Sequence, residues 1–197
     1  MPRLRVGVCA LTGKKANSED GGHPVATGVD LLKDAFGRIR ESGAGVVEGL
    51  DDDTLTRQPD VGGNPVAWLV WHAARVQDDH IADAAAVLGR DTGQVWLQEG
   101  FAARFGLDLP KEDTGYGHSP DQVRKVRASA DLLASYLSAV TDRTLSVLEG
   151  LSADELERVV DTRWDPPVTL AVRLVSVVED DLKHLGQAEY VRGLLGG

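Results

Sequence analysis

Residues 64–88 read NPVAWLVWHAARVQDDHIADAAAVL, and this stretch decides the fold. Asn64 followed by Pro65 is a helix start signal, because Asn can cap free backbone N–H groups and Pro loses no hydrogen bond at the first helical position. Apolar residues then recur at helical spacing as far as about Leu88. The stretch therefore predicts a long amphipathic helix.

Three further segments carry signals of the same kind. A helix is predicted over residues 29–50, with an interruption near Gly43 and Gly45, another over 120–149 behind the cap at Ser119, and a last one over 169–194. No segment alternates clearly enough to predict a strand. We expect an all-α four-helix bundle. A long connection over residues 89–119 joins its second and third helices, and residues 94–105 within it could form a short helix.

Two shorter features lie between the third and fourth helices. Ser152 with Glu155 forms a capping box that predicts a short helix, and the prolines of residues 164–167 predict an extended break. The remaining segment of note is the polar, Gly-containing stretch 13–28 near the N-terminus. It suggests an N-terminal extension over residues 1–25 ahead of one bundle domain at 26–197.

Composition removes several classes of function. The chain has 197 residues, with 21 Lys and Arg against 31 Asp and Glu, so its net charge is 21 − 31 = −10 and a general nucleic-acid surface is not expected. Its longest apolar run, Val66 to Trp71, is far below the roughly 18 residues of a membrane span, and no signal peptide is recognisable. The single cysteine, Cys9, excludes an intrachain disulfide and a thiolate-rich zinc site. A cytoplasmic protein is therefore expected.

The fourth helix carries a candidate pair of metal ligands. Asp180 and His184 lie one turn apart, about 40° from each other around the helix, so both side chains can point to one spot. Gln187 follows on the same side of the helix. The same spacing also occurs on solvent-facing helices, where the pair only supports the helix.

The second helix carries the partner for that pair. His72 shares a stripe with Trp68 and Asp79 and should face inward. By itself it could be a core histidine satisfied by a hydrogen bond, but ligand sites in bundles are built from facing helices. Asp79 is either a surface charge of the run Asp78-Asp79 or a general base beside the metal. His80 is less well directed, and His23 and His118 look like ordinary loop residues.

Four stretches together resemble a known family. They are NPVAWLVWHAARVQDDHIAD at 64–83, EGFAARFGL at 99–107, TGYGHSPDQV at 114–123 and RWDPPVTLAVRLVSVVEDDLKHLGQAEYVRG at 163–193. The chain resembles the DinB-like superfamily of four-helix metalloproteins over residues 29–195. It is most similar to the mycothiol-dependent branch, which has a domain like the N-terminal metal-binding domain of maleylpyruvate isomerase.

The resemblance implies a set of site residues. His72, Asp180 and His184 match the metal ligands of the family, although many members have His where this chain has Asp180. The expected metal is divalent, with Zn²⁺ favoured by an open three-ligand site. Gln187 is expected to serve the cofactor site as a hydrogen-bonding partner, and Asp79 to act as a catalytic base or orienting group.

The function implied is that of a metal-dependent mycothiol S-transferase, or of a thiol-dependent isomerase-like enzyme, in electrophile detoxification. Mycothiol would be the thiol cosubstrate and a small-molecule electrophile the second substrate, with no nucleic-acid or membrane partner, and a homodimer is allowed. The isomerase reaction itself does not carry over, because the isomerase uses a further C-terminal domain. The alternative is a non-catalytic DinB-like protein with a structural or vestigial metal site, acting in stress response or partner binding.

Overall fold

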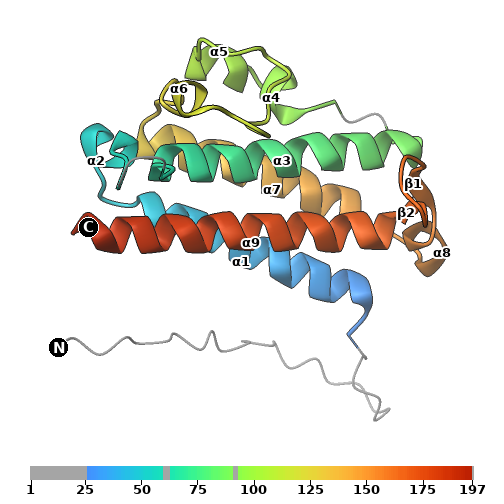
Figure 1. The fold of residues 1–197 in the computed structure, drawn as a ribbon. Helices are drawn as coiled ribbons and strands as arrows, with labels where there is room; N and C mark the ends of the chain where they lie inside the picture. The colour runs from blue at the N-terminus through green and yellow to red at the C-terminus, as the bar shows by residue number, and fades with distance from the viewer. Residues whose placement is uncertain (1–25, 60–62, 91–92, 197) are drawn as a thin grey trace, which may run out of the picture.

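The computed structural model describes residues 26–59, 63–90 and 93–196. Its four long helices are α1 (Gly28–Val47), α3 (Val66–Val87), α7 (Ala130–Leu148) and α9 (Leu170–Leu194), and they lie side by side as a bundle (Figure 1). Helices α3 and α9 run in opposite directions and pack together extensively. The predicted all-α four-helix bundle is confirmed.

The core of the bundle is continuous between all four helices. Helix α1 passes without a break through Gly43, where an added Cβ would lie 2.1 Å from a methyl carbon of Leu137 on α7. The absence of a side chain at Gly43 therefore lets α1 and α7 approach closely, rather than interrupting α1. On α9 the buried residues recur every three to four positions, which turns one stripe of that helix toward the core.

Two predicted helix starts need correction. The N-cap of α3 is Pro65, without a side-chain cap, so Asn64 does not have the predicted role. The helix predicted over 120–149 divides into α6 (Pro120–Val123) and α7. It divides because the Ser129 side chain accepts a hydrogen bond from the Leu132 N–H and starts a new helix there.

The connection between α3 and α7 forms a layer over α3 (Figure 1). It contains α4 (Val95–Gln98) and α5 (Phe101–Phe105) in place of one short helix. They are separated at Gly100, whose φ of 73° lies in the left-handed region that favours glycine. Helix α2 (Asp52–Thr56) precedes α3, and α8 (Ala153–Leu156) begins at the predicted capping box of Ser152.

A small hairpin precedes α9, so the expectation that no strand would form was wrong. Strand β1 (Val159–Asp161) pairs antiparallel with β2 (Val168–Thr169). Strands of three and two residues are too short to show an alternating pattern in the sequence. The predicted break at residues 164–167 is the turn between them, and α9 then begins behind its Thr169 cap as expected.

The proposed extension over residues 1–25, including Cys9 and His23, lies outside the described residues. The domain boundary near residue 26 therefore stays a prediction. Among the helices of the described ranges, none is both long and apolar enough to cross a membrane.

Candidate metal centre

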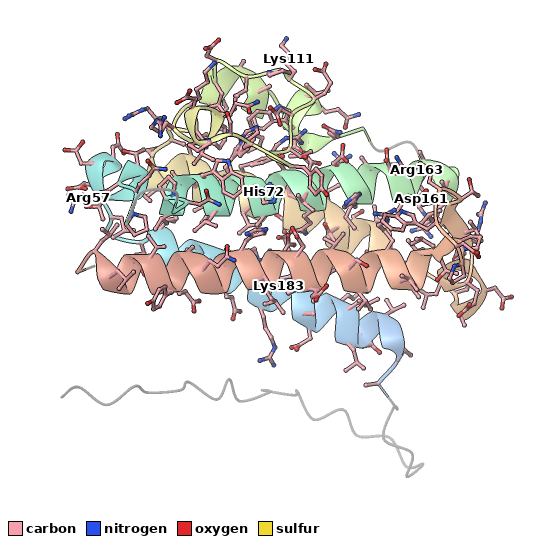
Figure 2. The ribbon with its side chains drawn as sticks, viewed as in Figure 1. Arg57, His72, Lys111, Asp161, Arg163 and Lys183 are labelled. Carbon is pink, nitrogen blue, oxygen red and sulfur yellow. The ribbon has the colours of Figure 1, made fainter. Side chains whose placement is uncertain are left out.

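Three predicted site residues meet between α3 and α9. His72, Asp180 and His184 each offer one ligand atom, and these atoms lie within 4.8 Å of one another. The two imidazole rings are 4.6 Å apart between centroids and nearly perpendicular, and His184 Nε2 is 3.7 Å from Asp180 Oδ1. Figure 2 shows His72 in the first half of α3, above α9 in that view. The fold thus brings together residues separated by more than 100 positions in the chain.

Hydrogen bonds orient both imidazole rings. His72 Nδ1 lies 2.5 Å from the Thr114 carbonyl oxygen, and His184 Nδ1 lies 3.1 Å from Gln187 Oε1. Both oxygens can only accept, so each Nδ1 carries the proton and donates it. Each Nε2 therefore keeps its lone pair for a metal ion, which is the usual arrangement of ligating histidines. Gln187 acts on His184 from this position and does not line the neighbouring cavity.

Gly115 is the residue that lets the connection reach His72. It is buried, with a φ of 93°, and a Cβ placed there would lie 2.8 Å from His72 Nδ1. A side chain at this position would separate the Thr114 carbonyl from the imidazole and would also strain the backbone. Gly115 was not among the predicted site residues, and its signal in the sequence is the Gly-Tyr-Gly stretch at 115–117.

His118 belongs to the surroundings of the site, contrary to its interpretation as an ordinary loop residue. Its side chain is only 2% exposed. The Trp68 indole N–H donates to His118 Nδ1 over 3.0 Å, so His118 Nε2 carries the proton and donates to Asp113 Oδ2 over 2.9 Å. Trp68 in turn stacks on His72, with 4.6 Å between ring centroids. The group of His118, Trp68 and Asp113 therefore supports the ligand ring from the side of the connection.

The chemistry of the three residues suits a divalent cation. Burial lowers the pKa of His72, which keeps its imidazole neutral and able to coordinate. Asp180 Oδ2 has no hydrogen-bond partner among the described residues, although the side chain as a whole is 40% exposed, so this oxygen is available to a cation. Two imidazoles and one carboxylate are a donor set typical of catalytic zinc. The residues present therefore fit such an ion.

A cavity of about 770 Å³ opens beside this group. Its lining includes His72 and Asp180, and also Asp79, the predicted base. Gln94 Nε2 donates to Asp79 Oδ1 over 2.7 Å, which fixes the carboxylate in the wall of the cavity. His80 lines the same cavity, and burial lowers its pKa, so it is neutral there. Asp79 and His80 thus line the same cavity as His72 and Asp180.

Asp78 is a structural residue that the sequence analysis missed. It is buried and accepts hydrogen bonds from the backbone N–H groups of Val95 and Trp96 and from the Tyr136 hydroxyl, each over 2.8 Å. Arg75 lies 3.6 Å away. The run Asp78-Asp79 is therefore not a surface charge pair, because its first member fastens α4 to α3 and α7. Its donors lie 17 or more positions away in the sequence, so no local pattern indicated it.

Comparison with known proteins gives a family model and a solved structure to which this chain is similar. The family model described as mycothiol-S-transferase matches residues 31–197. A solved structure, described as a conserved protein of locus from Enterococcus faecalis, superposes with a TM-score of 0.78 at 33% identity. That match covers 88% of this chain and 99% of the other. No curated protein matches the chain.

Proposed function

Because the chain belongs to the mycothiol-S-transferase family, within the DinB-like superfamily, we propose that it is a metal-dependent enzyme that transfers mycothiol to a small electrophile. The observation that carries the proposal is the convergence of His72, Asp180 and His184 beside a cavity large enough for two small substrates. Detoxification in a reducing cytoplasm would suit this chemistry, since it needs a reduced low-molecular-weight thiol.

The metal would be held by Nε2 of His72, Nε2 of His184 and the Asp180 carboxylate. We propose Zn²⁺, because imidazole and carboxylate donors suit it and three protein ligands leave a position open. Such an ion lowers the pKa of a thiol that coordinates it, so that the thiolate is present at neutral pH. Thr114 and Gln187 hold the two imidazole rings in the ligating orientation before any metal arrives.

The remaining residues would handle the proton and the substrates. Asp79, fixed by Gln94, would accept the proton that the thiol loses and pass it to solvent. The sulfur then attacks the electrophilic carbon, so that an S–C bond forms while the bond to the leaving group breaks and that group departs with the electron pair. Trp68, packed on His72, keeps water from one side of the site.

The test begins with the purified chain and Zn²⁺. We expect about one metal ion per chain, and metal-dependent conjugation of mycothiol to monochlorobimane. His184→Ala should lose both properties. Lys183→Arg is the matched control, because Lys183 is the neighbouring residue on α9 (Figure 2), its side chain is 65% exposed, and arginine can keep the ion pair with Glu179.

The outcomes separate the proposal from its alternative. Metal binding that survives in His184→Ala would contradict the proposed ligands. Metal binding without any conjugation, across a panel that also includes epoxides, would favour the non-catalytic DinB-like protein with a structural metal site.

A further inference from the structure

The end of the cavity away from the three candidate ligands is built around one buried carboxylate. Asp161 on β1 is 5% exposed at its side chain and binds two arginines. Arg163 donates to it through Nε and Nη2 over 3.0 and 2.9 Å, and Arg173 donates through Nη2 over 2.8 Å. Figure 2 shows Asp161 and Arg163 at the hairpin end of the molecule, away from His72. All three residues of this arginine cluster line the cavity.

The arginine cluster keeps unused donors. Its hydrogen bonds within the described ranges leave Nε and Nη1 of Arg173, and Nη1 of Arg163, without a protein acceptor. Arg173 is only 17% exposed, so its guanidinium is largely shielded from solvent. Hydrogen bonds from Arg163 hold the pKa of Asp161 far below its usual range, so the carboxylate is ionised. Two positive charges and one negative charge leave the cluster at 2 − 1 = +1.

The rest of the cavity has the opposite sign. Its other charged lining residues are Asp79, Glu179 and Asp180. The whole lining therefore sums to +1 − 3 = −2, and a divalent cation would bring it to zero. Glu179 is in addition paired with Lys183 over 2.6 Å. The positive charge of a metal-loaded cavity would then lie at two points, the ion and the arginine cluster.

Helix α9 sets the distance between these two points. Arg173 and Asp180 are seven positions apart and line the same cavity, as does Ser176 between them. Seven residues correspond to about 10 Å along a helix. Two exposed aromatic side chains, Tyr116 and Trp164, contribute flat apolar surface to the lining. The cavity thus offers an attack position at one end, aromatic walls, and cationic donors about 10 Å away.

From this arrangement we propose that the electrophile carries a carboxylate, which binds to Arg173 and Arg163. Asp161 is a positioning residue that holds the two guanidinium groups at the cavity wall. The inference rests on the proposed function, since it assigns the electrophile of that reaction. Two charge-assisted hydrogen bonds from a guanidinium suit a carboxylate better than any neutral group.

A pair of matched substrates tests the proposal. 4-(Chloromethyl)benzoate and 4-(chloromethyl)benzamide differ only in the charged group, and in both the thiol sulfur displaces chloride from the benzylic carbon. With Zn²⁺-loaded protein and mycothiol, we expect kcat/KM to be about 10- to 100-fold higher for the benzoate. Arg173→Gln should remove this preference, because kcat/KM should fall far more for the benzoate than for the benzamide. Arg57→Gln, at the opposite end of the molecule in Figure 2, is the control and should keep the preference.

Calorimetric binding of the unreactive 4-methylbenzoate and 4-methylbenzamide gives a readout that does not depend on turnover. The benzoate should bind more tightly, and this difference should disappear in Arg173→Gln. If neither chloride is conjugated while the binding difference persists, the proposed reaction fails and the carboxylate site stands. If wild type conjugates both chlorides at equal rates, and Arg173→Gln leaves these rates unchanged, the carboxylate site is overturned and the proposed reaction stands. An equal loss of kcat/KM with both chlorides in Arg173→Gln would also overturn the carboxylate site, because the arginines would then bind the thiol.

Discussion

Two Asp-Asp pairs lie on the helices that face each other, Asp78-Asp79 on α3 and Asp180-Asp181 on α9. In each pair one member lines the cavity, Asp79 or Asp180, and the other is buried in the protein. The two pairs look alike in the sequence. They differ in what surrounds the buried member.

Asp78 is surrounded by donors, whereas Asp181 is not. Asp78 accepts three hydrogen bonds and lies beside Arg75. Both oxygens of Asp181 lack a hydrogen-bond partner within the described part of the chain, and its exposure is 0%. Burial raises the pKa of Asp78, and it raises the pKa of Asp181 well above the usual range. A buried carboxylate thus stabilises the fold only where the fold supplies its donors.

The largest effect is expected from Asp78→Ala. The substitution leaves two backbone N–H groups, the Tyr136 hydroxyl and Arg75 without their acceptor, so the free energy of unfolding should fall by about 3–5 kcal/mol. Urea denaturation measures it. Asp78→Asn keeps one accepting oxygen, so its free energy of unfolding should fall by less. This variant keeps the test usable if the alanine variant does not fold. A loss below about 1 kcal/mol in both variants would remove the distinction between the two buried aspartates.

Asp180→Ala should affect metal affinity instead of stability. Removing one of three proposed ligands should weaken Zn²⁺ binding by at least about 100-fold, measured by competition with a chromophoric chelator. The metal-free variant should unfold at a denaturant concentration close to that of metal-free wild type, because Asp180 Oδ2 has no partner to lose among the described residues. Unchanged Zn²⁺ affinity would exclude Asp180 as a ligand.

Asp79→Asn tests whether the two cavity-lining aspartates, Asp79 and Asp180, have different roles. The amide can still accept from Gln94, so stability should stay within about 0.5 kcal/mol of wild type. Zn²⁺ affinity should also be unchanged, while conjugation at neutral pH should slow by about 100-fold, since the amide cannot accept the thiol proton. A full rate in this variant would show that Asp79 is not the base.

Asp181→Asn gives the smallest effect, and its sign depends on pH. The pKa of Asp181 is raised in the folded state, so its contribution to stability is complete below about pH 3.9 and is lost as the pH rises toward the folded value. Asn does not titrate. In chelator-treated protein, the free energy of unfolding of the variant should therefore increase relative to that of wild type as the pH rises, by about 1–3 kcal/mol at neutral pH. A difference that does not change with pH would contradict a protonated Asp181.

Part of the fold could be predicted because its signals are local. The start of α9 at Thr169 and the box at Ser152 rest on contacts three residues apart, which a sequence displays directly. The division of α6 from α7 also had such a signal at Ser129, but the helix was predicted to start once, at the cap of Ser119, and to continue through Ser129. The β1–β2 hairpin had none, because strands this short depend on pairing with each other.

The candidate site divides in the same way. Helical spacing alone placed Asp180 next to His184 and turned His72 inward, because side chains four positions apart share a face of a helix. Only the tertiary structure decided that Thr114 and Gly115 orient His72, that His118 supports it, and which aspartate of each pair is buried. These outcomes depend on partners from distant segments, and a carboxylate or an imidazole takes its charge and its role from the groups packed around it.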